Sequence, residues 1–155
     1  MVPIKVFFAE KKMNKTEILE ILNIKNNTKF DEIRDKALMG EKIKVNQLLS
    51  ETEILNDEVF FYLNVLNYRI MRLHEIIKIN DNKENYERTV ENLKPPIFWK
   101  DKPIVLQQLR KWSQQKIEDA LIKINEIEVL MKKNSSIRND VVIKNLIIGL
   151  TNKAS

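Results

Sequence analysis

The sequence predicts an all-α fold, a helical bundle of about six to eight helices, from three observations. A chain of 155 residues with 43% hydrophobic and 32% charged side chains suits one domain with an apolar core. Two glycines and four prolines leave long segments without a helix breaker. Apolar residues also recur at spacings of three and four, which is the period of an amphipathic helix.

Residues 1–12 are predicted to form a tail whose structure the pattern does not define. The run 2–8 has strand-like composition, but no second segment offers it a partner strand. The run is also far shorter than the roughly 20 apolar residues of a membrane span, and Pro3 and Lys5 interrupt it. We therefore expect no targeting or transmembrane segment. Together with the absence of cysteine, this favours a cytoplasmic location.

Two separate helices are predicted to follow the tail. Asn14 and Glu17 stand at capping-box spacing and open a short helix through Leu22, which the asparagine-containing run 23–27 should end. Thr28 is then the predicted N-cap of the next helix, with an apolar stripe behind it.

Gly40 closes that second helix, because glycine adopts the left-handed conformation at a C-terminus without penalty. A helix is expected at about 41–50, and a long one at about 57–79 with Asn56 as its cap. The long helix carries a continuous bundle seam of apolar residues: Val59, Leu63, Leu66, Ile70, Leu73 and Ile77.

A proline pair marks the clearest internal boundary. Pro95 and Pro96 cannot lie inside a helix, so the short helix predicted at about 84–92 ends before them. The segment 93–102 is therefore expected to be a joint, and a helix should follow at about 103–112.

Ser113 is the predicted N-cap of a long helix that ends near Lys133. Its inward face is expected to hold Ile117, Ala120, Leu121, Ile124, Ile127 and Met131. Ile122 and Val129 lie 120–140° from that face at about 100° per residue and form a second apolar patch. A last helix at about 139–150 is apolar nearly all round and should be buried in the bundle or against another chain.

No group of residues predicts catalysis. With glycine only at Gly40 and Gly149 the chain cannot build a phosphate-binding loop, and it has no cysteine nucleophile. His74 is the only histidine, and Lys78 occupies the position where a second metal ligand would stand. We interpret His74 as a packing residue, and we expect a chain that is not an enzyme and needs no cofactor or metal.

Glu128 is unusual because helical geometry places it on the apolar face of its own helix. A carboxylate in that position requires a partner, and Lys132 stands one turn later. We predict that this pair braces a contact between helices.

The basic excess lies in the C-terminal part of the chain, since residues 94–155 carry 12 basic and 6 acidic side chains. Within 94–112, aromatic rings alternate with cations, as in platforms for single-stranded nucleic acid. The candidate contacts are Lys94, Trp99, Lys100, Arg110 and Lys111. The other interpretation, which we favour on sequence, is that Phe98, Trp99 and Trp112 fill the helix joint while the lysines remain in water.

The stretch KPPIFWKDKPIVLQQLRKW, followed by Ser113 and QQKIEDALIKINEIEVLMKK, resembles the C-terminal region of the delta subunits of the bacterial DNA polymerase III clamp loader. Upstream, TKFDEIRDKALMGEK is similar to the segment that opens the C-terminal domain in that family, and MNKTEILEIL is similar to the lid helix before it. The resemblance covers about residues 13–150.

The resemblance implies that residues 13–27 are the last helix of a lid-type domain and that 28–155 form a helical collar domain. Collar domains are non-catalytic and assemble the loader ring in DNA replication, with the gamma/tau motor and delta-prime subunits as partners. The sliding clamp is bound through the AAA+ half of the family, which residues 1–12 do not match. DNA is a further candidate partner, and a membrane is not. The expected subunit interface comprises Ile122, Val129, Val142, Leu146 and Leu150.

Overall fold

The computed structural model describes residues 14–80, 85–134 and 136–155. Its helices are α2 (Lys15–Leu38), α3 (Lys42–Glu51), α4 (Val59–Ile79), α5 (Tyr86–Glu91), α6 (Lys102–Lys111), α7 (Gln114–Lys133) and α8 (Asn139–Ala154), with a 3-10 turn η1 (Asn56–Glu58) before α4. These ranges contain helices and no strand, which confirms the all-α prediction. The predicted tail 1–12 lies outside the described residues.

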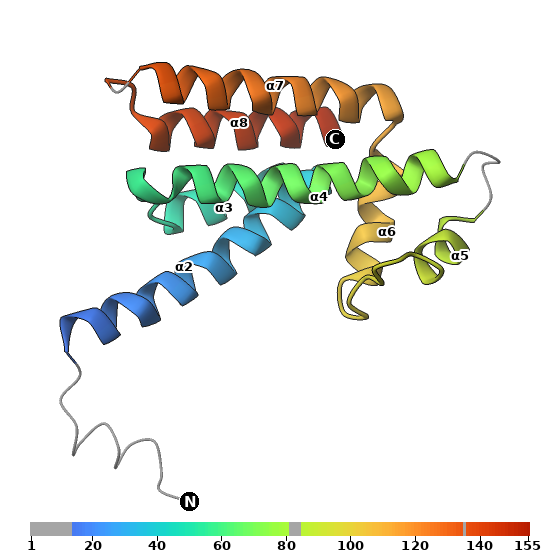
Figure 1. The fold of residues 1–155 in the computed structure, drawn as a ribbon, viewed down its shortest axis with the longest axis horizontal. Helices are drawn as coiled ribbons and strands as arrows, with labels where there is room; N and C mark the ends of the chain where they lie inside the picture. Colours follow the sequence, from blue (N-terminus) through green and yellow to red (C-terminus); the bar gives the residue numbers. More distant parts are fainter. Residues whose placement is uncertain (1–13, 81–84, 135) are drawn as a thin grey trace, which may run out of the picture.

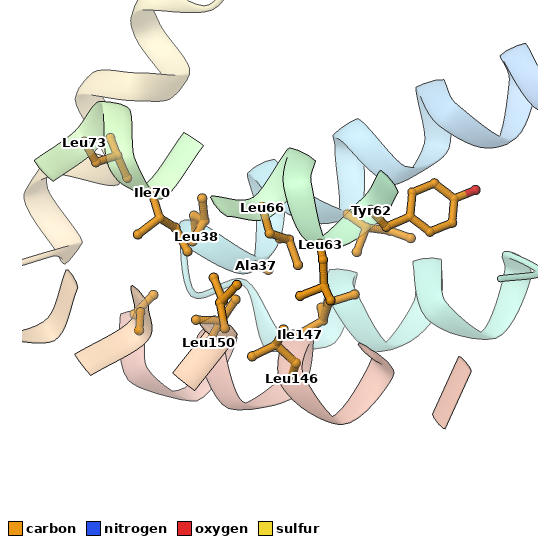
Figure 2. Close-up of a cluster of buried hydrophobic side chains, with 14 of the residues drawn as sticks. Ala37, Leu38, Tyr62, Leu63, Leu66, Ile70, Leu73, Leu146, Ile147 and Leu150 are labelled. Carbon is orange, nitrogen blue, oxygen red and sulfur yellow. The ribbon is translucent and has the colours of Figure 1, made fainter. Parts of the chain in front are cut away.

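The core is organised around α4, which packs along α7 on one side and contacts α2, α6 and α8 on others (Figure 1). Five of the six predicted seam residues of α4 are buried, with Leu66, Ile70 and Leu73 completely inaccessible, and the sixth, Ile77, is partly buried. Figure 2 shows how this seam meets Ala37 and Leu38 of α2 and Leu146, Ile147 and Leu150 of α8. The core is therefore formed by residues far apart in the sequence.

The prediction of a helix break at 23–27 is wrong, because α2 runs without interruption from Lys15 to Leu38. Its start was predicted correctly: Asn14 accepts from the Glu17 amide at 2.8 Å, and the Glu17 carboxylate accepts from the Asn14 amide at 3.3 Å. Thr28 consequently lies inside a helix and not at the start of one. Each asparagine costs a helix only about 0.7 kcal/mol or less, whereas the true breakers, glycine and proline, are absent from this range.

The first half of α2 extends away from the other helices, while its second half enters the bundle (Figure 1). Phe30, Ile33 and Ala37 of that second half are buried, and this burial anchors the continuous helix. The division between a lid segment and a collar domain at residue 28 falls inside α2. That division stays a prediction, since one helix can belong to two domains.

Asn56 does not cap the long helix as predicted. α4 begins at Val59 after the 3-10 turn, and the Asn56 side-chain oxygen instead accepts from the backbone amide of Asp140 at 3.3 Å. Asp140 lies in the first turn of α8, where the amide groups have no helical partner. Asn56 therefore satisfies the start of a helix 84 residues away in sequence.

The close of α2 was predicted correctly at Gly40, which has a φ of 75°. A Cβ atom at Gly40 would lie 2.8 Å from the backbone nitrogen of Ser155, so the position requires glycine for space as well as for conformation. α8 continues to Ala154, four residues beyond the predicted end. Thr151 and Ala154 are buried, and this packing holds the last turn.

Candidate interaction sites

A buried polar cluster fixes α6 against α2 and α4. One guanidinium nitrogen of Arg69 lies 3.2 Å from the Gln108 side-chain oxygen and 3.3 Å from a carboxylate oxygen of Asp35. Gln108 in turn donates to the backbone carbonyl of Asp35 at 3.3 Å. Burial lowers the pKa of Arg69, and the nearby Arg34 lowers it further, whereas Asp35 opposes the shift. The cluster thus joins three helices through one guanidinium.

The sequence-based prediction overlooked Arg69 and Gln108. Arg69 lies between Leu66 and Leu73 on the buried arc of α4, so its position in the apolar seam was the available signal. Gln108 lies beside Leu109 on the buried face of α6. A charged residue within an apolar arc indicates a buried partner. The same reasoning predicted a partner for Glu128.

Trp112, between α6 and α7, is buried at 4% exposure, as the helix-joint interpretation predicted. Its indole nitrogen donates to the backbone carbonyl of Leu38 at 2.8 Å. Leu38 is the last residue of α2, where carbonyl groups have no helical donor. Trp112 therefore both fills the core and completes the C-terminal end of α2.

The other two rings differ from that interpretation, because Phe98 is 58% and Trp99 67% exposed. Leu93 and Ile97 take the inward positions of the joint instead, one buried and the other half-buried. The prediction that Phe98 and Trp99 fill the joint is therefore wrong. Both rings project from a turn in which the Asp101 amide donates to the Phe98 carbonyl at 2.9 Å.

The exposed turn carries cations beside its rings. The Lys100 ammonium lies 5.3 Å from the centroid of the Trp99 ring, within cation–π range, and Lys94 is exposed in the same segment. Arg72 of α4 donates to the carbonyl of Pro95 and so ties the segment to the bundle. Three of the predicted nucleic-acid contacts, Lys94, Trp99 and Lys100, are thus exposed on one segment that Arg72 anchors.

The remaining predicted contacts, Arg110 and Lys111, are exposed at the opposite end of α6. A ten-residue helix spans about 15 Å, so about that length separates them from the aromatic turn. α6 presents Pro103 and Gln107 on the exposed side between these ends. The five predicted residues therefore lie in two groups.

A groove of about 480 Å³ lies between α7 and α8. Three predicted interface residues, Val142, Leu146 and Leu150, line it together with Ala120 and Ile127. Its rim is polar and is formed by Asp119, Lys123, Asn145 and Lys153. The Lys153 ammonium lies 3.3 Å from the Asp119 carboxylate and so links the two helices along the rim.

Gly149 also lines this groove, and a Cβ atom placed there would meet nothing within 4 Å. The groove therefore has room for a Cβ atom at this point of α8.

Ile122 and Val129, the other two predicted interface residues, do not line the groove. They are exposed at 60% and 41% on another side of α7. Leu121, next to Ile122, lines a second groove together with Met71 of α4. The five residues predicted as one interface thus divide between two surfaces.

The predicted pair on α7 is formed, since the Lys132 ammonium lies 2.6 Å from the Glu128 carboxylate. Lys132 also lies 6.0 Å from the centroid of the Phe60 ring on α4. The pair therefore sits at the contact between α4 and α7, where the bracing role was proposed.

Replacing Glu128 with alanine is expected to lower the free energy of unfolding by about 0.3–1 kcal/mol, the range of partly exposed ion pairs. Glu126→Ala is the matched control, because it gives the same helix the same new residue and removes only a 3.8 Å pair with Lys123. Urea denaturation of both variants measures the difference. Equal stabilities for the two variants would exclude a bracing role for Glu128.

His74 is half-buried on α4, with one ring nitrogen 3.6 Å from the Glu118 carboxylate of α7. Across the described ranges, no group of three or more His, Asp or Glu side chains is arranged to hold a metal ion. Within the same ranges, no helix is long and apolar enough to cross a membrane.

Comparisons with protein-family models, with curated proteins and with solved structures found no match to this chain. The interaction sites therefore have to be interpreted from their own chemistry, with the resemblance noted from the sequence as a guide.

Proposed function

We propose that this chain is a non-catalytic assembly domain of the delta-subunit type, which joins a bacterial clamp loader by helix-to-helix contact in DNA replication. Its partners would be the gamma/tau motor and delta-prime subunits. The observation that carries the proposal is the groove between α7 and α8, which has apolar walls, a polar rim and a glycine that leaves it open. An apolar floor inside a polar rim is the usual arrangement of a protein–protein interface.

The resemblance assigned Val142, Leu146 and Leu150 to a subunit interface, and all three line the groove. Val142 is partly buried and supports the proposal, whereas Leu146 and Leu150, at 4% and 3% exposure, belong mainly to the core of the chain itself. A side chain from a neighbouring helix could bury apolar surface there without rearranging the bundle, because the walls are already formed by packed core residues. The α-helical fold and the lack of a phosphate-binding loop agree with a non-catalytic role.

A plug variant tests this function. Gly149→Trp places a large ring in the groove, and we expect a pull-down at micromolar concentration to recover the motor and delta-prime subunits with the natural chain but not with the variant. Failure of the natural chain to recover either subunit would overturn the proposal. Recovery by the plug variant as well would exclude the groove as the contact surface.

Gly149→Ala is the matched control and makes a prediction of its own. Gly149 lies inside α8, so alanine should raise the free energy of unfolding by about 0.5–1 kcal/mol while leaving the groove open. Thermal or urea denaturation measures the gain, and the pull-down should be unchanged. A loss of stability would mean that the space around Gly149 is occupied.

We also propose, as a second candidate function, that the chain binds single-stranded nucleic acid through the turn at Phe98 and Trp99. The exposure of both rings beside Lys100 favours this candidate, because exposed rings can stack on bases while buried ones cannot. This function is compatible with assembly into a loader, since the turn and the α7–α8 groove share no residue.

Trp99→Ala is expected to weaken binding to a single-stranded oligonucleotide by about 1–3 kcal/mol, the contribution of one stacked base. Fluorescence anisotropy at several salt concentrations measures the affinity, which should fall as salt rises. Phe61→Ala is the control, because Phe61 is also an exposed aromatic but lies on α4. Equal affinities for the two variants would remove this candidate.

A further inference from the structure

A groove of about 570 Å³ lies between α4 and α5. α5 packs against α4 and leads into the segment that carries the aromatic turn (Figure 1). Arg88 of α5 and Lys94 of that segment line the groove, and both side chains are exposed. The groove thus adjoins the start of the segment that continues to Phe98 and Trp99.

The side chains that line the groove give it a positive charge. Within the described ranges, neither Arg88 nor Lys94 forms an ion pair with an acidic side chain. Among the described lining residues Glu75 is the only acid, and the Arg72 guanidinium lies 2.6 Å from its carboxylate. The two acidic residues of α5 itself do not line the groove. Two cations are therefore left to attract an anion.

The C-terminal ends of α4 and α5 also reach the groove, since their C-cap residues Asn80 and Asn92 line it. A helix C-terminus carries at most about half an elementary negative charge. The two full positive charges of Arg88 and Lys94 exceed this effect, so the groove still favours an anion.

The walls of the groove also suit the uncharged parts of a nucleotide. Ile79, which is 58% exposed, and Leu93 supply apolar surface. The Thr89 hydroxyl and the Asn92 amide belong to the groups that commonly contact phosphate and sugar oxygens. The volume lies in the usual range of ligand pockets, about 300–1,000 Å³. A phosphate-bearing ligand with an apolar ring therefore matches more of the groove than a simple anion does.

Arg72 fixes the groove relative to the aromatic turn. It donates to the carbonyl of Pro95 and pairs with Glu75 in the groove wall. Lys94 and Trp99 are five residues apart, so their Cα atoms are at most about 18 Å from each other. A single strand can therefore reach both, with phosphates in the groove and bases on the exposed rings.

We propose that this groove continues the single-strand site of the aromatic turn, so that Arg88 and Lys94 bind phosphates of a strand whose next bases stack on Trp99. This path rests on the second function proposed above. Along it, Arg88 becomes a phosphate contact that the sequence pattern did not identify.

Arg88→Gln tests the path, because Arg88 lies on α5 and not on the turn. Fluorescence anisotropy measures the affinity for oligothymidylate and oligouridylate of about 4–16 nucleotides, the usual range of single-strand sites. We expect Arg88→Gln to weaken binding roughly tenfold at low salt, as for the loss of one charged hydrogen bond. The slope of log affinity against log salt should become less steep by about 0.7, the value for one phosphate contact.

Lys133→Gln is the matched control. Lys133 is an exposed cation at the C-terminal end of α7, which lies at the opposite end of the bundle from α5 (Figure 1). This variant should bind oligonucleotides like the natural chain. Circular dichroism of both variants should be unchanged, because both side chains are exposed.

Inorganic polyphosphate distinguishes a strand from a simple anion, because it carries phosphates without bases. It should bind more weakly than either oligonucleotide, and Trp99→Ala should not change its affinity. Polyphosphate that binds as tightly as the oligonucleotides would overturn the proposal, since the groove would then be a general anion site.

The variants Arg88→Gln and Trp99→Ala together separate the groove from the turn. If Trp99→Ala weakens binding while Arg88→Gln behaves like Lys133→Gln, the turn binds the strand and the path through the groove is overturned. If only Arg88→Gln weakens binding, the groove does not continue a site at the turn, and the proposal fails with the second function. A natural chain that binds neither oligonucleotide would overturn both.

Discussion

Replacing Trp112 with alanine is expected to lower the free energy of unfolding by about 3–5 kcal/mol, the usual cost of removing a large buried aromatic side chain. Trp112 is 4% exposed, so its removal leaves a cavity at the junction of α6 and α7. It also leaves the Leu38 carbonyl without its donor at the end of α2. Urea denaturation followed by circular dichroism measures the loss.

Trp112→Phe separates the two contributions. Phenylalanine keeps most of the apolar ring but cannot donate to Leu38, and we expect a loss of about 1–2 kcal/mol. A loss as large as that of the alanine variant would contradict the cavity argument, and no loss would contradict the hydrogen bond. The chain has only two tryptophans, so the fluorescence of this variant reports Trp99 alone and should resemble indole in water.

Local signals were sufficient to predict most helices. Ser113 caps α7, accepting from the Lys116 amide at 3.3 Å, because β-region backbone and a side-chain oxygen are all that an N-cap needs. The seam of α4 could be predicted from spacing alone, because a helix with apolar residues every three or four positions buries that face in any bundle.

The incorrect predictions depended on contacts that are distant in sequence. A capping residue in the sequence shows only that a side-chain oxygen is available to accept a hydrogen bond. The side-chain oxygen of Asn56 accepts from an amide of α8 and not from an amide of α4. The run 23–27 is a weak local signal, and burial of the second half of α2 outweighs it.

The aromatic rings illustrate the same limit for the candidate sites. Composition could not distinguish Trp112, which lies in the core, from Trp99, which lies in solvent, because both stand beside lysines. In the structure Leu93 and Ile97 take the inward positions of the joint, and the rings of the turn lie outside it. Predicting that outcome requires knowing how α5 packs against α6. The residues next to the two tryptophans in the sequence do not determine that packing.

Arg69→Met is expected to lower the free energy of unfolding by about 2–4 kcal/mol. Methionine preserves much of the buried chain length but removes the donors to Gln108 and Asp35. Removing one partner of a buried ion pair costs about 3–5 kcal/mol, because the other charge remains without compensation. Arg34 reduces the cost here, since its guanidinium lies 2.9 Å from the Asp35 carboxylate.

A double variant tests whether the cost comes from the uncompensated charge. Asp35→Asn combined with Arg69→Met removes both charges, and its loss of stability should be smaller than the sum of the two single losses, as measured by denaturation of all four proteins. Additive losses would mean that Arg69 contributes by packing alone.

Because the cluster joins α6 to α2 and α4, Arg69→Met should also loosen α6, which carries the aromatic turn at its start. Faster amide hydrogen exchange in α6 than in α8 would show that this guanidinium holds the turn in place.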